Sequence, residues 1–280
     1  MTPLDPHGAA GTLALLTAGS AAGLVGSMLG VGGGVFIVPT LVLLFGLPMP
    51  GAVAASLLAV VATSSASSAS HLSKGTVNIR LGIVLETATV LGALCGAALA
   101  ALVPERPLVA AFGLLLGVVC VLLWRRAETE DEGPSSEPAG LLGEEYLDAA
   151  TGRRVRYAVR RLPLALGTSF AAGNLSALLG IGGGVLKVPV LHLFCGLPMK
   201  ASAATSTFML GVTASAGVFA YAVRGRLDPV VAGTVALGVF GGSWLGTRLL
   251  PKTRDAGVRR LFALLCAFLA LQMLRRALHG

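Results

Sequence analysis

Lys187 is the residue of this chain that packing alone explains least well. It lies in the stretch "LGIGGGVLKVPVLHLF", where apolar side chains and glycines surround it and one histidine follows. A cation inside an apolar run is costly, and it is a functional candidate by default because its charge could neutralise a bound anion. The alternative is that its long side chain reaches a nearby layer of lipid headgroups.

A glycine cluster precedes Lys187, and the chain contains this cluster twice. The stretch "LGVGGGVFIVPTLVLLFGLPMP" begins at Leu29, and "LGIGGGVLKVPVLHLFCGLPMK" begins 150 residues later. Three consecutive glycines cost roughly 1 kcal/mol each in helix propensity, so they favour a break in a membrane helix over a packing face. The N–H groups at the start of the next helix would then attract an anion. The glycines expected to contact this anion, the substrate, are Gly32, Gly33, Gly34, Gly182, Gly183 and Gly184. Hinge or structural roles are expected for Gly30, Pro39, Gly180 and Pro189.

Polar side chains that could orient an anion follow the glycine clusters. Hydroxyl groups can donate hydrogen bonds to oxyanions, although in membrane helices they also bond to the preceding turn of their own helix. We expect Ser56, Thr205 and Ser206 to line the substrate site because they lie closest to the repeated stretch. Asn174 could reach the second glycine cluster from the helix before it, or bond to a neighbouring helix.

Glu86 is the one acidic residue within an expected membrane span. A buried carboxyl group at this position could carry a coupling proton. The interpretation that we favour from the sequence is simpler, namely a glutamate near a loop that pairs with Arg80.

Other kinds of chemistry lack the residues that they need. The glycine clusters do not fit the phosphate-binding pattern G-x-x-x-x-G-K-[ST] or the dinucleotide pattern G-x-G-x-x-G, whose last glycine is replaced by Val35. The four cysteines lie apart inside apolar runs, as packed thiols do, and no cluster has metal-ligand spacing. His71 near Ser68 is the one candidate for a catalytic pair, and it lies beside Lys74 at a helix end. We therefore expect no cofactor, no metal and no enzymatic activity.

The composition places these residues in a membrane. Hydrophobic residues make up 55% of the 280 residues, charged residues only 12%, and the mean hydropathy is +0.83. Soluble domains carry about 25% charged residues, so this chain has too few to cover a surface in water. The net charge of +8 comes from Lys and Arg at the ends of apolar runs, as in cytoplasmic flanks, and nucleic acid is not an expected partner. The N-terminus lacks the basic region of a signal peptide, so the first apolar run is expected to be a retained helix.

An internal repeat organises the chain. Residues 30–50 and 180–200 are identical at thirteen of twenty-one positions, and the offset of 150 continues at Ser56 and Ser206 and at Gly92 and Gly242. The expected domains are a first membrane repeat over 1–126, a linker over 127–161 and a second repeat over 162–280. The linker is acidic and then basic, and we expect a cytoplasmic loop that is partly helical around 141–150.

Each repeat contains five apolar runs, and the second run is too short to span a bilayer, which takes roughly 20 residues. We therefore expect an all-α integral membrane protein in which each repeat has about four full helices and one short helix after a glycine break. If the short helix crosses, the two repeats are inverted, and if it turns back, they are parallel. The distribution of Lys and Arg favours the inverted arrangement. The pairs Gly92-x-x-x-Gly96 and Gly242-x-x-x-Gly246 are expected to be close helix-packing sites.

The two glycine-rich stretches, with "HLSKGTVNIR" and "YAVRGRLDPV" after them, resemble the duplicated signature of the TauE/SafE sulfite exporter family. The resemblance covers nearly the whole chain outside 127–158. It implies a multi-pass inner-membrane transporter of bacterial type, which we expect to be an exporter that works by alternating access. The expected substrate is sulfite or a small organosulfur anion such as sulfoacetate. The chain departs from an even repeat where Ile37 corresponds to Lys187 and Val42 to His192. The alternative is a proton- or cation-coupled permease for another small solute.

Overall fold

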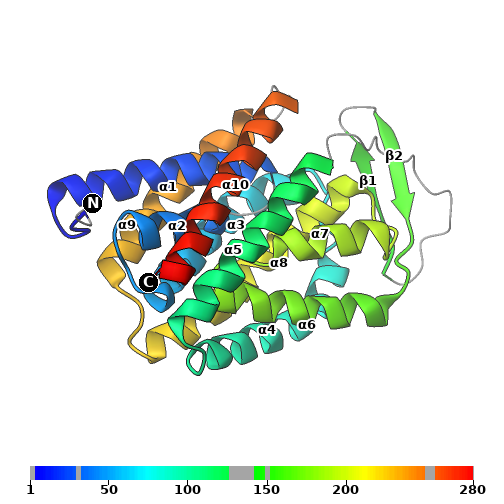
Figure 1. The fold of residues 1–280 in the computed structure, drawn as a ribbon. Coiled ribbons are helices and arrows are strands. Elements are labelled where there is room, and N and C mark those ends of the chain that lie inside the picture. Colours follow the sequence, from blue (N-terminus) through cyan, green and yellow to red (C-terminus); the bar gives the residue numbers. More distant parts are fainter. Residues whose placement is uncertain (1–3, 30–32, 126–141, 149–151, 250–255, 280) are drawn as a thin grey trace.

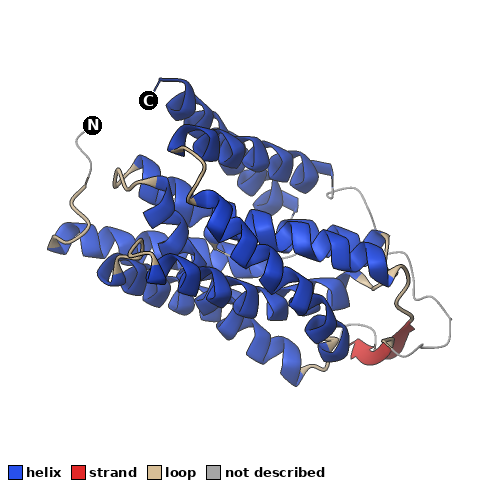
Figure 2. Cartoon of the chain, turned by 90° about the horizontal axis from the view of Figure 1, so that it is seen from below, coloured by secondary structure: helices blue, strands red, loops and turns tan. Residues whose placement is uncertain are grey.

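The computed structural model describes residues 4–29, 33–125, 142–148, 152–249 and 256–279. Within these residues the chain forms ten α-helices and one β-hairpin (Figures 1 and 2). The helices are α1 (Ala9–Leu29), α2 (Gly34–Leu43), α3 (Met49–Ser73), α4 (Ile79–Ala100), α5 (Glu105–Arg125), α6 (Leu162–Leu179), α7 (Gly184–Leu193), α8 (Met199–Val223), α9 (Pro229–Leu249) and α10 (Ala256–His279). The strands are β1 (Glu144–Asp148) and β2 (Arg153–Tyr157).

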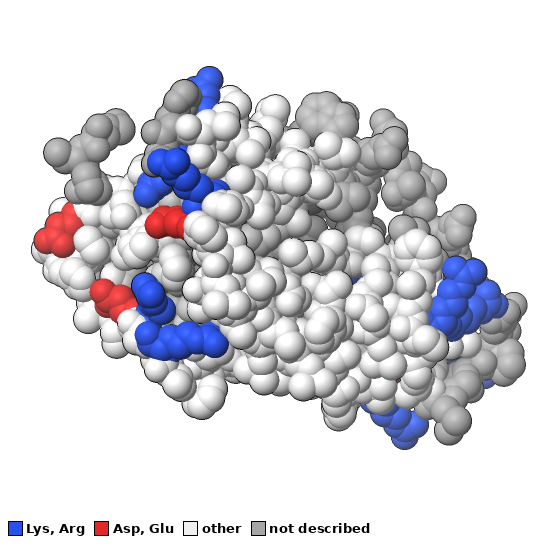
Figure 3. Space-filling view, turned by 60° about the horizontal axis from the view of Figure 1, so that its bottom comes forward, with Lys and Arg blue, Asp and Glu red and all other residues white. Residues whose placement is uncertain are grey.

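The long helices match the thickness of a bilayer. In the described part of the chain, α1, α3, α4, α6, α8 and α9 are long and apolar enough to cross a membrane. A helix of this length spans roughly 30 Å, whereas the ten-residue helices α2 and α7 span roughly half of that. Figure 3 agrees with a membrane position, because charged side chains gather toward two opposite ends of the face shown and an uncharged band separates them. The prediction of an all-helical membrane domain is confirmed at this level.

The bundle has two ends, which we name by what lies there. At the hairpin end, the side-chain amide of Asn78 bonds to the Leu142 carbonyl, and the Arg160 N–H bonds to the Cys195 carbonyl. The opposite, terminal end holds the start of α1 and the end of α10 (Figure 1). There the Leu4 N–H bonds to the carbonyl of Leu44.

These contacts fix the direction of the short helices. Because Leu4 precedes α1 and Leu44 follows α2, α2 returns to the end at which α1 begins. The bond between Arg160 and Cys195 makes α7 return in the same way to the hairpin end, where α6 begins. The two short helices therefore enter the bundle from opposite ends.

The linker differs from its prediction. Part of the segment expected to be helical, around 141–150, is strand β1, which pairs with β2 in antiparallel register, so the prediction of a helix there is wrong. Side chains alternate between the two faces of this hairpin, as they do in a strand: Tyr146 is buried while Leu147 beside it is exposed. Arg154 and Arg156 of β2 both bond to Glu145 of β1, which stabilises the pairing of the strands. Tyr157 is buried and packs the hairpin against the helical bundle.

Glycines allow the helices to approach closely, as predicted. A Cβ on Gly92 or Gly96 of α4 would overlap the carbonyl oxygens of Phe170 and Asn174 on α6. A Cβ on Gly242 or Gly246 of α9 would meet the α1 backbone in the same way. These overlaps confirm the two predicted packing sites.

The two sequence halves exchange helices. α4, the fourth helix of the first half, packs against α6 and α8 of the second half. α9, the fourth helix of the second half, packs against α1 and α3 of the first half. Two groups result, α1–α2–α3–α9 and α6–α7–α8–α4, which meet where α3 packs against α8. Their elements correspond in the chain, because α2 and α3 begin 150 residues before α7 and α8.

Candidate functional site

The second helix break is formed by glycines in a backbone conformation that other residues rarely adopt. Gly180, Gly182 and Gly183 have φ values of 72°, 79° and 75°, where a Cβ would strain the chain. Gly180 is the C-cap residue of α6, and Gly183 is the N-cap residue of α7. Because glycine has no side chain, the first N–H groups of α7 receive no side-chain cap from Gly183. The break lies between α3 and α8, because a Cβ on Gly182 would touch Val60 and Leu210. The first N–H groups of α7 thus begin inside the bundle.

The two breaks meet at Ser56 of α3. The buried Ser56 hydroxyl donates a hydrogen bond of 2.7 Å to the Gly180 carbonyl and a longer one of 3.4 Å to the Gly34 carbonyl. Gly34, the first residue of α2, lies so close that a Cβ would overlap the carbonyl oxygen of Gly180. The starts of both short helices therefore lie near one another, deep in the protein.

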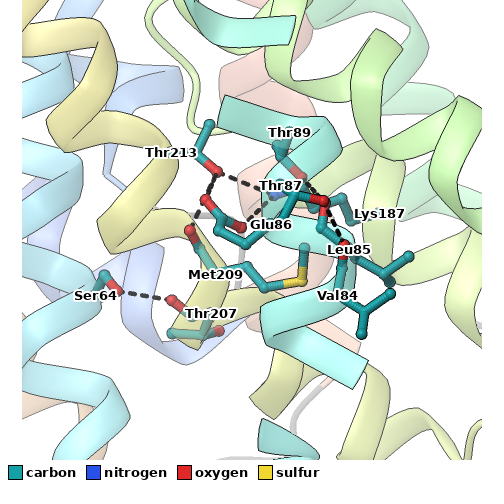
Figure 4. A network of polar contacts seen from close by, with 10 residues as sticks. All are labelled: Ser64, Val84, Leu85, Glu86, Thr87, Thr89, Lys187, Thr207, Met209 and Thr213. Atoms are coloured by element: carbon teal, nitrogen blue, oxygen red, sulfur yellow. Dashed lines mark hydrogen bonds and ion pairs between the residues drawn. The ribbon is translucent and has the colours of Figure 1, made fainter. Parts of the chain in front are cut away.

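Lys187 lies in the first turn of α7, where its N–H bonds to the Gly183 carbonyl. Its side chain is 2% exposed, which excludes the interpretation that it extends to the lipid headgroups. The ammonium Nζ donates a hydrogen bond of 3.2 Å to Oγ1 of Thr213 on α8 and lies 3.7 Å from Oε2 of Glu86 on α4 (Figure 4).

Thr213 completes this cluster. Its hydroxyl lies 2.5 Å from Oε1 of Glu86, to which it donates, and 3.1 Å from the Met209 carbonyl. Glu86 is 8% exposed, and its pairing with Arg80, which the sequence favoured, is wrong. Arg80 instead lies near Glu144 of the hairpin, where its charge lowers the pKa of that carboxyl while burial, the larger effect, raises it. Glu86, Lys187 and Thr213 form what we name the ion-pair cluster.

The charge balance of the cluster follows from its position. The start of a helix carries a partial positive charge, which disfavours a lysine in the first turn. The Glu86 carboxylate compensates both the helix terminus and the ammonium group, and a charge pair with bridging hydrogen bonds is the form in which ions are tolerated away from water. The cluster therefore places a lysine whose charge is already balanced in the first turn of α7.

The comparisons with known proteins agree with a membrane transporter. A family model described as "Sulfite exporter TauE/SafE" matches residues 15–273, nearly the whole chain. The chain belongs to the TauE/SafE sulfite exporter family. It is a multi-pass membrane protein of a transporter family, which is not a class of enzymes.

Several TauE/SafE relatives are bacterial. The chain is 26% identical to the probable membrane transporter protein YunE of Bacillus subtilis, over 84% of this chain and 85% of that protein. It is 27% identical to a probable membrane transporter protein of Xylella fastidiosa, over 94% of this chain and 95% of that protein. The sulfite exporter TauE/SafE family protein 6 of Arabidopsis thaliana is 31% identical, over 42% of this chain and 28% of that protein. No solved structure matches the chain at a significant level.

Not every predicted site residue of this TauE/SafE protein lies at the breaks. Thr205 accepts a hydrogen bond of 3.0 Å from the Asn78 N–H at the start of α4 and so helps to join α8 to the α3–α4 loop. Asn174 lies on α6 where that helix crosses α4, with its backbone against Gly92 and Gly96. Ser206 is fully buried, and its hydroxyl has no hydrogen-bond partner among the described residues.

The expected hinge residues also differ in whether they lie at a helix break. Gly180 ends α6 in a left-handed conformation, as a break requires. Pro39 and Pro189 lie inside α2 and α7, not at their ends. Gly30 lies outside the described residues, and so does Gly32, which was expected to contact the substrate.

Thr213 was not among the predicted site residues, although the sequence offered two signals. It corresponds to Thr63 across the repeat, and it lies seven positions after Ser206, two helical turns on. The pair itself was also open to inference, since Glu86 and Lys187 carry opposite charges inside expected spans, and buried charges pair. Within the described residues no group of three or more His, Cys, Asp or Glu side chains could hold a metal ion.

Proposed function

We propose that this protein carries a small sulfur-containing oxyanion, such as sulfite or an organosulfur anion like sulfoacetate, across a bacterial cell membrane. The observation that carries the proposal is the buried Lys187 in the first turn of α7. That helix follows a break whose first glycine, Gly180, lies against the start of the other short helix at Gly34. Backbone N–H groups and a cation suit a small oxyanion. The family's name supports sulfur chemistry.

The binding groups have separate roles in this proposal. The starts of α2 at Gly34 and α7 at Gly184 supply N–H donors, and Lys187 supplies the charge. Ser56 holds the two breaks together through its bond to Gly180. The hydroxyl of Ser206, which has no hydrogen-bond partner among the described residues, remains for the substrate.

We further propose that the two halves are inverted repeats. The corresponding helices α1 and α6 begin at opposite ends of the bundle, and broken helices at equivalent repeat positions are a common design of transporter sites. Alternating access would then move the group α1–α2–α3–α9 against the group α6–α7–α8–α4. The residues of the ion-pair cluster lie wholly within the second group, so they can move together as one body.

The test is the thermal stability of the purified protein against a panel of sulfite, sulfate, thiosulfate, sulfoacetate, taurine, acetate and phosphate. A ligand at 100 times its dissociation constant stabilises the folded state by about 2.7 kcal/mol, which a melting experiment detects. We expect a shift with one sulfur anion and a much smaller shift in Lys187→Ala. His192→Ala is the matched control: it removes the other polar side chain of α7, which contacts the Leu197 carbonyl at the hairpin end.

A rise in melting temperature that appears in the wild type and in His192→Ala, and shrinks in Lys187→Ala, supports a binding site at Lys187. No shift with any anion, or an equal shift in Lys187→Ala, would contradict it.

A further inference from the structure

The ion-pair cluster joins two charges that the repeat does not duplicate. Lys187 corresponds to Ile37 in the first half, and Glu86 corresponds to Ala236 in the second, whereas Thr213 corresponds to Thr63. The first half therefore has the hydroxyl without the charges. Because packing evidently works without the ion pair at the equivalent positions, the pair has a role other than filling space.

The two oxygens of Glu86 have different surroundings. Oε1 accepts the hydrogen bond of Thr213 at 2.5 Å. Oε2 faces the Lys187 ammonium at 3.7 Å and has no hydrogen-bond partner among the described residues. One oxygen is thus fixed by the protein, while the other is held by charge alone and is free to accept a proton.

Charge balance links that proton to the substrate. With Glu86 ionised, Lys187 is already neutralised, and an added anion would leave a net negative charge in an apolar interior, which is strongly unfavourable. With Glu86 protonated, the ammonium and the start of α7 face the anion without a competing carboxylate, and Lys187 and a monovalent anion sum to zero.

We propose that Glu86 is the proton-coupling residue of this transporter, whose protonation releases Lys187 to bind the anion, so that one proton travels with each monovalent anion. This inference rests on the proposed function. The proton comes from water on one side and binds the carboxylate, and the anion binds the ammonium. On the other side both leave and the ion pair forms again, so the cycle moves no net charge and begins and ends with the same protein.

We assign the coupling proton to Glu86 because the other ionisable side chains on the helices around it lie toward the helix ends or bond elsewhere. α4 packs against α6, which has no ionisable side chain, and against α8, whose ionisable residues are Lys200 in its first turn and Tyr221 near its other end. Tyr221 bonds to the Ala177 carbonyl. On α7 the second ionisable residue, His192, contacts the Leu197 carbonyl.

The experiment uses the full protein in liposomes with labelled sulfite, and protein-free liposomes measure the passive leak. Exchange of labelled for unlabelled sulfite at equal pH tests transport itself. Uptake with an acidic outside tests coupling: electroneutral symport accumulates the anion about tenfold per pH unit, because one unit is a tenfold proton ratio. We expect Glu86→Gln to lose accumulation while exchange continues. Glu105→Gln is the control, since that carboxylate bonds to the Met49 N–H at the terminal end, and it should keep both.

Three results would overturn the inference. Absence of exchange in the wild type would contradict the proposed function and this inference with it. Exchange without a response to the pH gradient would contradict the inference alone, and so would accumulation that persists in Glu86→Gln, because the proton would then travel on the substrate.

A second measurement covers the case in which Glu86→Gln does not fold. A pH dye inside weakly buffered vesicles of the wild type should report one proton entering with each monovalent anion, at a rate that a protonophore does not change. Anion entry without acidification would overturn the inference.

Discussion

The chemistry of single residues at this site depends on partners that lie on different helices. Lys187, Glu86 and Thr213 come from α7, α4 and α8 and are buried together. A lone charge in such a place is unfavourable, so each member of the pair depends on the other. This dependence can be measured as stability.

Removing one charge of the pair should destabilise the protein more than removing both. We expect Lys187→Ile to cost about 3–5 kcal/mol, because it leaves the Glu86 carboxylate buried and unpaired. The double variant Lys187→Ile/Glu86→Ala copies the first half, where Ile37 and Ala236 occupy these positions, and should recover most of the loss. Unfolding of the purified proteins in detergent measures the difference. A double variant no more stable than the single variant would contradict the pairing.

The hydrogen bond between the two breaks should also contribute to stability. Ser56→Ala removes the bond to the Gly180 carbonyl and leaves that buried oxygen without its donor, which costs about 1–3 kcal/mol. Ser65→Ala is the matched control on the same helix, because the exposed Ser65 hydroxyl donates to the Val61 carbonyl in its own preceding turn. Equal melting temperatures for the two variants would show that Ser56 does not join the breaks.

At the scale of elements, close helix contact through glycine sets the positions of the charges. α4 carries Glu86 and crosses α6 at Gly92 and Gly96, where no side chain fits. Larger residues there would move α4 and with it the carboxylate.

Gly92→Ala should therefore destabilise the protein by about 1–3 kcal/mol, the usual cost of overpacking, since its Cβ would overlap the Phe170 carbonyl. Gly241→Ala on α9 has open space around it and should stabilise by up to about 1 kcal/mol through helix propensity. Thermal unfolding of both variants gives the sign of each change. A Gly92→Ala protein as stable as the wild type would contradict the close crossing.

The sequence predicted those elements whose cause is local. Glycine runs disfavour a continuous helix and spaced small residues permit a close helix crossing, and both effects are local. The break at Gly180–Gly183 and the crossing at Gly92 could therefore be foreseen. The pairing of Glu86 with Lys187 could not be read from spacing, because it requires α4 to join the other half of the chain. The hairpin could not be predicted because its charged residues are compatible with a strand or a helix. The strand is favoured by the burial of Tyr146 and Tyr157 against the bundle, which the sequence does not show.

For the whole molecule, the distribution of charge gives its orientation. Among the described residues at the hairpin end are Lys74, Arg80, Arg154, Arg156, Arg160, Arg161, Lys200 and Arg248. Those at the terminal end are Arg106, Arg224, Arg226, Arg275 and Arg276. Cytoplasmic loops carry the excess of Lys and Arg, so we expect the hairpin end inside the cell and both ends of the chain outside.

Labelling with a membrane-impermeant thiol reagent checks this orientation. In a variant without the four native cysteines, Arg226→Cys should react in intact cells, and Arg154→Cys should react only after permeabilisation. Both positions are exposed, so reactivity reports the side of the membrane. The reverse pattern would contradict the orientation.

The proposed function requires that the start of α7, with Lys187, binds a sulfur oxyanion. Its most direct test is calorimetric titration of the purified protein with sulfite, compared with Lys187→Ile/Glu86→Ala, which removes the charges and keeps a neutral, packed interior. We expect saturable binding to the wild type and at least tenfold weaker binding, about 1.4 kcal/mol or more, to the double variant. Equal binding to the two proteins would place the anion elsewhere and contradict a binding role of Lys187.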